Sequence, residues 1–259
     1  MKKELSDMYF LGRKCIICNR YGLYKLKNRR RVKCKHCKKY YSLKRLRRDL
    51  DILYYFYLEV SARKTAKEME LDYGVVHRRF MEFRKLIANY CNEQAIRLNG
   101  KIELDETYFG GKRKGKRGRG SKNKAIAFGI LERKGKVYTV IIENVSAETL
   151  MREIQNKTRK GSVFYTDGFK SYASLRQYGK HDTIDYDYSY VKGKTHINGI
   201  EGFWSYSKER FHKYHGINKK NYPLYLKEME FRFNNRKENV LKLLVDICIR
   251  RRRISAKLH

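Results

Sequence analysis

The chain has 259 residues, of which 41% are hydrophobic, enough for one sizeable domain and one or two small ones. Lysine and arginine outnumber aspartate and glutamate by 62 to 27, which gives a net charge of +35 spread along the whole sequence. This excess predicts a polyanionic partner. Nucleic acid is favoured over a membrane, because the chain has no run of about 18 apolar residues and no apolar signal segment. We therefore expect a cytoplasmic, nucleoid-associated protein.

The N-terminal segment, residues 1–48, carries two Cys-x-x-Cys pairs, formed by Cys15, Cys18, Cys34 and Cys37. Four thiolates on two turns are the ligand set of a closed tetrahedral zinc site. A segment this short cannot build a core by itself, so we predict a zinc ribbon held by one structural Zn²⁺. The basic run between the pairs, Arg29, Arg30 and Arg31, is predicted to contact DNA. The alternative is that zinc only holds the ribbon together and the ribbon does not contact DNA.

Residues 49–98 are predicted to be helical, because they contain no proline and have apolar residues at helical spacing. Within them, residues 61–79 read as a short helix with Ala66 at its packing point, a turn and a second, basic helix. This order is typical of a helix-turn-helix, and Arg78 and Arg79 on the second helix are its predicted DNA contacts. An ordinary helical hairpin that links two domains is the alternative.

The apolar period changes at residue 100, and residues 99–259 form the third predicted domain, which includes C-terminal helices. Strands are predicted over residues 101–106, 124–132 and 136–143. A helix capped by Ser146 and ending near Lys157 follows, then a strand over 162–166, a helix to about 178, a strand near 183–186 and a helix from Asn198. This β-β-β-α-β-α-β-α order predicts an α/β domain with an RNase H-like, retroviral-integrase-like fold.

The segment between the first two of these strands is rich in glycine and basic residues. Such a composition cannot pack into a core, but it can lie along phosphates, so Lys112, Arg113 and Lys114 are predicted DNA contacts. A solvated hairpin without a ligand is the alternative.

Acidic residues occur in three separate settings within the third domain, and a chain this basic has few carboxylates. Asp105 and Asp167 lie at or near the ends of apolar strands that are neighbours in the predicted sheet. Asn198 and Glu201 share one helix face, and Lys208 lies two turns farther along it. Clustered carboxylates bind hard divalent cations, so the sequence predicts a site for two Mg²⁺ or Mn²⁺ ions.

Two details of this site follow from alternation and helical spacing. Glu106 is predicted to point away from Asp105, because successive strand residues face opposite sides of a sheet, and to pair with a lysine. Phe203 and Trp204 on the last helix are predicted core residues, with base stacking as the alternative.

Three motifs resemble the DDE transposases of bacterial insertion sequences, in the branch that has an N-terminal zinc ribbon. They are Asp-Glu-Thr-Tyr-Phe-Gly-Gly-Lys at 105–112, Thr-Asp-Gly at 166–168 and His-x-Asn-x-x-Glu-Gly-Phe-Trp at 196–204. The resemblance extends from Cys15 through Arg236. It implies that Asp105, Asp167 and Glu201 are the catalytic, metal-binding triad and that Lys208 contacts DNA phosphate. Some members use an asparagine as third ligand, so Asn198 stays open as the alternative to Glu201.

The activity that the resemblance implies is magnesium-dependent cleavage and strand transfer of the element's own ends by transesterification. Its partners would be double-stranded DNA, both terminal inverted repeats and target, bound by a homodimer or higher oligomer. A sequence-specific DNA-binding regulator without catalysis is the alternative, although it leaves Asp105, Asp167 and Glu201 unexplained. An RNA-cleaving RNase H-like nuclease would explain the acids and leave the two upstream modules without a role.

Overall fold

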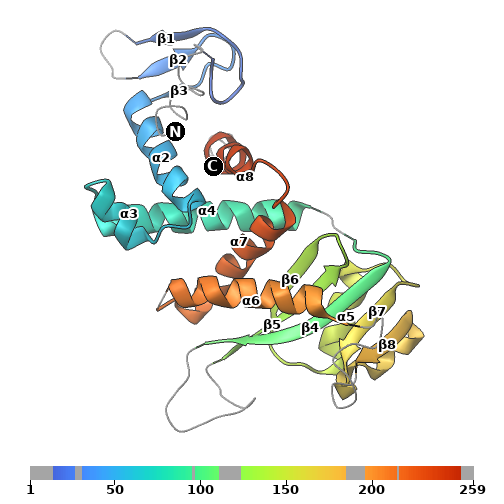
Figure 1. Cartoon of the computed structure of the whole chain (residues 1–259). Helices are drawn as coiled ribbons and strands as arrows, with labels where there is room; N and C mark the ends of the chain where they lie inside the picture. Colours follow the sequence, from blue (N-terminus) through green and yellow to red (C-terminus); the bar gives the residue numbers. More distant parts are fainter. Residues whose placement is uncertain are drawn as a thin grey trace. The chain divides into compact units, whose positions relative to one another are not determined.

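The computed structural model describes residues 14–26, 31–94, 97–110, 124–184, 196–214 and 216–251, and it divides into two compact units (Figure 1). Unit 1 combines Met1–Tyr90 with Glu238–His259, and unit 2 spans Cys91–Lys237. This division differs from the predicted one, because the C-terminal segment groups with the N-terminal half. The division into three functional parts stays a prediction.

Unit 1 begins with a small antiparallel sheet of strand order β1-β2-β3. Its strands are β1 (Leu23–Lys25), β2 (Val32–Cys34) and β3 (Tyr40–Tyr41). They are very short, as expected of a module that has few apolar residues to bury. Two of the predicted DNA contacts, Arg29 and Arg30, lie outside the described residues, and Arg31 directly precedes β2.

The helices of unit 1 are α2 (Leu43–Tyr57), α3 (Ala62–Glu68), α4 (Tyr73–Glu93), α8 (Val240–Val245) and the helical segment η3 (Asp246–Arg251). The hydroxyl of Ser61 accepts a hydrogen bond from the N–H of Lys64 and so caps α3. Ala66 is buried, and Glu70 takes a left-handed conformation with φ 52° in the turn before α4. The predicted helix, turn and helix is confirmed as a structure, and its role in DNA recognition stays a prediction.

Unit 2 is built on a five-stranded sheet of order β6-β5-β4-β7-β8 (Figure 1). The strands are β4 (Lys101–Phe109), β5 (Ala125–Glu132), β6 (Val137–Ile142), β7 (Val163–Asp167) and β8 (Lys180–Ile184). β4, β5 and β6 pair antiparallel, whereas β7 is parallel to both β4 and β8. Three antiparallel strands extended by two parallel ones are the RNase H-like arrangement that the order of elements predicted.

Two elements differ from the prediction in detail. β8 begins at Lys180, three residues before the predicted position, because its first residues are polar and gave no apolar signal. The element after β7 is the 3₁₀ helix η1 (Lys170–Gln177). The cap at Ser146 is confirmed, since its hydroxyl accepts a hydrogen bond from the N–H of Thr149 at the start of α5 (Ala147–Lys157).

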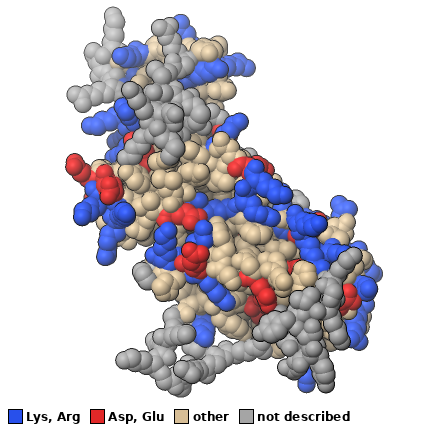
Figure 2. Space-filling model, viewed as in Figure 1, with Lys and Arg blue, Asp and Glu red and all other residues tan. Residues whose placement is uncertain are grey.

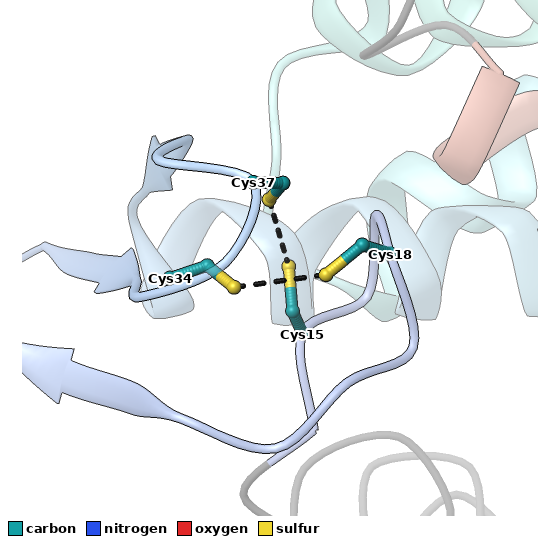
Figure 3. A group of neighbouring side chains, drawn as sticks. All are labelled: Cys15, Cys18, Cys34 and Cys37. Carbon is teal, nitrogen blue, oxygen red and sulfur yellow. Dashed lines mark hydrogen bonds between the residues drawn. The ribbon is translucent and has the colours of Figure 1, made fainter.

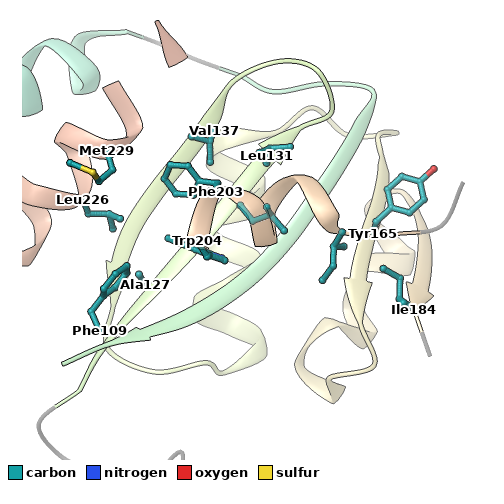
Figure 4. Packing of buried hydrophobic residues seen from close by; sticks show 12 residues of the cluster. Phe109, Ala127, Leu131, Val137, Tyr165, Ile184, Phe203, Trp204, Leu226 and Met229 are labelled. Atoms are coloured by element: carbon teal, nitrogen blue, oxygen red, sulfur yellow. The ribbon is translucent and has the colours of Figure 1, made fainter. Parts of the chain in front are cut away.

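Helices cover both faces of the sheet. α5 and η1 pack on one face, over a core that includes Leu104, Phe128 and Tyr172. α6 (Asn198–Lys213) and α7 (Tyr222–Asn234) pack on the other face, where Phe203 and Trp204 are buried, as predicted (Figure 4). The short η2 (Lys219–Asn221) precedes α7. Among the described residues, no helix is long and apolar enough to cross a membrane.

Candidate functional site

The four N-terminal cysteines meet at one point of the ribbon (Figure 3). Their Sγ atoms all lie within 4.8 Å of one another, and both Cys15 to Cys37 and Cys18 to Cys34 are 3.6 Å apart. A tetrahedral ion with Zn–S bonds of about 2.3 Å separates its sulfur ligands by about 3.8 Å. The distances therefore fit one zinc ion and are too long for disulfide bonds.

The two turns that carry the cysteines have the same backbone geometry. The N–H of Asn19 donates to the carbonyl of Cys15, and the N–H of Lys38 donates to the carbonyl of Cys34. Asn19 and Lys38 both take the left-handed conformation, with φ 56° and 57°. Each turn directs its two thiols toward the common centre.

The pKa values of Cys34 and Cys37 are shifted in opposite directions. Burial favours the neutral form of Cys34, but hydrogen bonds from the N–H groups of Cys37 and His36 outweigh it and lower its pKa to about 7. Burial and the adjacent thiols raise the pKa of Cys37 to about 12. Four neighbouring thiolates repel one another without a cation, so this donor set fits Zn²⁺.

Removing this donor set is predicted to unfold the ribbon. Cys34→Ala with Cys37→Ala leaves two thiols, too few for a closed zinc site, and a module this small depends on its metal to fold. We expect the purified double variant to lose its stoichiometric zinc and the protease resistance of residues 14–42. Cys248→Ala is the matched control, because Cys248 is a buried cysteine outside the cluster. Full zinc retention by the double variant contradicts the site.

Asp105 and Asp167 lie on adjacent strands of the unit 2 sheet. β4 continues to Phe109, so Asp105 lies in the middle of its strand and not near its end as predicted, whereas Asp167 ends β7. β4 and β7 pair in parallel through Glu103 and Tyr165, and two residues farther along the two strands carry Asp105 and Asp167. Alternation places both carboxylates on the face that α6 covers. The predicted adjacency of these two strands is confirmed.

The third group of predicted residues lies on α6. This helix buries Ile200, Phe203, Trp204 and Ser207 against the sheet and exposes Asn198, Glu201 and Lys208. These three positions recur at intervals of three and seven residues, so they share the solvent-facing side. Glu201 lies in the first turn, where the partial positive charge of the helix N-terminus stabilises a carboxylate.

The pKa of the Asp105 carboxyl is raised to about 7. Burial is the largest cause, and repulsion from Glu106, Asp167 and Glu201 adds to it. Carboxylates from β4, β7 and α6 are therefore near enough to Asp105 to disfavour its ionisation. A divalent cation would offset this repulsion, so the donor set fits Mg²⁺ or Mn²⁺. Among the described residues, the cysteines alone already form a tight ligand cluster.

Glu106 lies on the opposite face of β4, as predicted. Its Oε2 accepts a hydrogen bond from the hydroxyl of Tyr172 at 2.8 Å, and pairing with a lysine stays a prediction. Tyr172 belongs to the core under α5 and η1, so this contact ties Glu106 to the far side of the sheet.

A buried carboxylate that the sequence did not single out, Glu103, holds the start of α6. Glu103 is 1% exposed and lies two residues before Asp105 on β4. Its Oε2 accepts a hydrogen bond from the N–H of Ile200 at 2.9 Å, and its Oε1 accepts one from Nε of Arg133 at 2.8 Å. Arg133 also donates to the carbonyl of His196, just before the helix. Glu103 and Arg133 therefore fix the first turn of α6, which carries Asn198 and Glu201.

Gly199 is required by this contact. A Cβ on Gly199 would lie 2.7 Å from Oε2 of Glu103 and 3.1 Å from Cδ2 of Leu131. The glycine in the third motif thus allows β4 and the helix N-terminus to approach closely. In the sequence, Glu103 is an acidic strand residue two positions before Asp105. Nothing in that pattern indicates its contact with the helix N-terminus.

The predicted DNA contacts have different surroundings. Arg78 is exposed on α4, but Arg79 is buried, and its guanidinium pairs with Asp49 at 2.8 Å and also with Glu82. The surroundings of Arg79 therefore argue against the predicted DNA contact and indicate a role in holding α2 to α4. Lys112, Arg113 and Lys114 lie outside the described residues. Figure 2 shows basic side chains spread widely over the visible face, which accords with the net charge.

Comparison with known proteins assigns a family to this arrangement. Residues 97–234, more than half of the chain, match the ISXO2-like transposase domain. The chain belongs to the ISXO2-like transposase family. This assignment confirms the resemblance to the DDE transposases of insertion sequences. The matched residues of this transposase include all five candidate active-site positions and Glu103, Arg133 and Gly199, whereas the four cysteines lie before them.

Two relatives of this transposase agree with the assignment. A transposase-like protein of Haemophilus influenzae is 42% identical over 103 residues, covering 39% of this chain and 84% of the relative. A protein in the transposable element ISH50 of Halobacterium salinarum is 24% identical over 263 residues, covering 89% of this chain and 87% of the relative. Among solved structures, the catalytic domain of Mos1 mariner transposase overlaps 65% of this chain and 92% of its own, with 12% identity and a TM-score of 0.29.

Proposed function

We propose that this transposase cleaves the ends of its own insertion sequence and joins them to target DNA by metal-dependent transesterification. One observation carries the proposal: Asp105 and Asp167 lie at matching positions of the adjacent parallel strands β4 and β7, on the sheet face that α6 covers. Burial, with added repulsion from Glu106, Asp167 and Glu201, raises the pKa of Asp105 to about 7. Family membership supplies the reaction class, and the network of Glu103 and Arg133 supplies the fixed geometry that such a site needs.

The residues have distinct roles in this proposal. Asp105, Asp167 and Glu201 would hold two Mg²⁺ or Mn²⁺ ions, with Asn198 as the alternative to Glu201. When bound, such ions lower the pKa of the attacking water or hydroxyl and stabilise the leaving oxygen of the phosphodiester. Lys208, on the same exposed side of α6 as Glu201, contacts a DNA phosphate and positions the strand.

The basic modules of unit 1 recognise double-stranded DNA in this proposal. The ribbon and the α3–α4 pair read the terminal inverted repeats, with Arg31 and Arg78 among the exposed contacts. The protein then acts as a homodimer or higher oligomer on paired ends and works at the nucleoid in the cytoplasm. The basic residues 29–30 and 112–114, which lie outside the described residues, remain predicted phosphate contacts.

The test combines the purified full-length protein with DNA that carries the terminal repeats of its element. We expect nicking at the element ends and joining to a target plasmid when Mg²⁺ is added, and neither product without a divalent ion. Labelled ends resolved on a denaturing gel report both steps. Tight binding of the repeats without cleavage under any divalent ion favours the DNA-binding regulator.

Metal affinity is predicted to depend on pH through Asp105. Because its pKa is raised to about 7, a metal must displace a proton below that pH. We expect the association constant for Mg²⁺ or Mn²⁺ to rise from pH 5.5 to about 7, by at most about tenfold per unit, and then to level off. Calorimetric titration in buffers of different ionisation enthalpy measures both affinity and proton release.

The stability of the metal-free protein provides the control for this pH dependence. Between the ordinary carboxyl pKa of 3.8 and about 7, folded Asp105 holds a proton that the unfolded chain releases. The contribution of Asp105 to stability is therefore greatest at low pH and is lost as pH rises through about 7. Asp105→Asn should remove this part of the pH dependence. Metal affinity that stays constant from pH 5.5 to 7 contradicts the prediction.

A further inference from the structure

The three-stranded sheet of the ribbon has one face that its own core does not use. Tyr24 on β1 lies opposite Lys33 on β2, and Lys33 lies opposite Tyr40 on β3. Residues directly opposite each other in paired strands project from the same face. A lysine flanked by two tyrosines thus forms a row across the sheet, which we call the tyrosine face.

The two rings are presented to solvent. Tyr24 is 40% exposed and Tyr40 is 57% exposed, whereas the other face of the sheet buries Val32, Cys34 and Tyr41. The guanidinium of Arg31 lies over the Tyr40 ring, 5.5 Å from its centroid. Arg31 is two residues from Lys33 and therefore belongs to the same face.

The charge around the tyrosine face selects its ligand. Residues 14–42 contain no aspartate or glutamate, so basic side chains surround the rings without an acidic neighbour in the ribbon. Aromatic rings combined with cations that track a backbone are the features by which proteins hold single-stranded nucleic acid. A purely phosphate-binding surface would need the lysine and arginine but not two exposed rings.

We propose that the tyrosine face binds single-stranded DNA, with bases stacked on Tyr24 and Tyr40 and a phosphate held by Lys33. Bases of a duplex are already stacked on both sides, so exposed rings gain this contact only from unpaired bases. β1 and β3 flank β2, so Tyr24 and Tyr40 lie on strands about 10 Å apart, with Lys33 between them. The proposal goes beyond the catalytic function and does not require it, because binding is measured without added Mg²⁺.

Fluorescence anisotropy of the zinc-loaded, full-length protein tests this with labelled oligothymidine and a duplex of equal length. Tyr24→Leu and Tyr40→Leu should each weaken single-strand binding by about tenfold and leave duplex binding unchanged. Tyr24→Phe and Tyr40→Phe keep the rings and should bind as the wild type does. Stoichiometric zinc in every variant shows that the ribbon has kept its fold.

A tryptophan at the face reports the contact directly. The native tryptophan, Trp204, is the only one in the chain and is buried in unit 2. The additional emission of a Tyr40→Trp variant should therefore be quenched when oligothymidine, but not duplex, is added.

Three results overturn the proposal. An equal loss for single strand and duplex in the leucine variants indicates a duplex surface. Unchanged single-strand binding in both leucine variants assigns the rings to another partner, such as a protein. Loss of binding in the phenylalanine variants indicates that the hydroxyls, and not stacking, make the contact. These binding measurements do not depend on whether the protein cleaves DNA.

Discussion

A full-length Asp105→Asn variant is expected to lose magnesium-dependent strand cleavage almost completely. The substitution keeps the size of the side chain and removes the charge at the centre of the carboxylate group, where Asp167 and Glu201 also act on Asp105. A metal ion supplies several kcal/mol of charge stabilisation in the transition state. Losing about 4 kcal/mol corresponds to a rate lower by roughly 10³. Labelled element ends incubated with Mg²⁺ measure the rate, and binding to the same DNA should persist.

Variants at the other positions separate the roles within the site. Asp167→Asn and Glu201→Gln should match the loss at Asp105, because each removes one metal-binding charge. Asn198→Ala should do less harm if Glu201 is the third ligand, and Lys208→Ala should weaken DNA positioning while metal binding persists. A Glu201→Gln enzyme that cuts at the normal rate contradicts this assignment. If Asn198→Ala were then inactive, the third ligand would be Asn198.

The sheet and its acidic residues could be predicted because their signals are local. β4, β5 and β6 are rich in apolar and β-branched residues, and Asp105 and Asp167 interrupt or end such runs. Because the predicted order of elements makes β4 and β7 neighbours in the sheet, these two residues were expected to lie close together. The helix face of Asn198, Glu201 and Lys208 followed from helical spacing alone.

Contacts between distant, charged side chains could not be predicted in this way. Arg79 looked like a DNA contact because it lies in a basic run, but Asp49, thirty residues earlier, pairs with it in the core of unit 1. Arg133 lies in a polar turn after β5, where a solvated arginine is the ordinary expectation. Glu103 lies on the same face of β4 as Asp105, and the sequence does not single it out. Each role depends on a partner that the pattern of one segment does not reveal.

Glu103→Gln is expected to destabilise unit 2 by about 3 kcal/mol, because it removes one charge from a buried pair and leaves the other in place. Glu103 is 1% exposed, and its partner Nε of Arg133 lies 2.8 Å away. The weaker acceptor also loosens the bond to the N–H of Ile200, which holds the first turn of α6. Urea unfolding followed by the near-ultraviolet signal of Trp204, which packs on this face, measures the change.

Two glycines of α6 provide the matched test of the same contact. Gly199→Ala places a methyl group 2.7 Å from Oε2 of Glu103, and such overpacking costs about 1–3 kcal/mol. Gly202→Ala, three residues later on the same helix, meets no atom within 4 Å and should stabilise the helix by up to about 1 kcal/mol. Opposite signs in the two unfolding curves locate the constraint at the Glu103 contact. If both alanines stabilise the protein equally, the helix N-terminus is free to move away from β4, and Glu103 does not position Glu201.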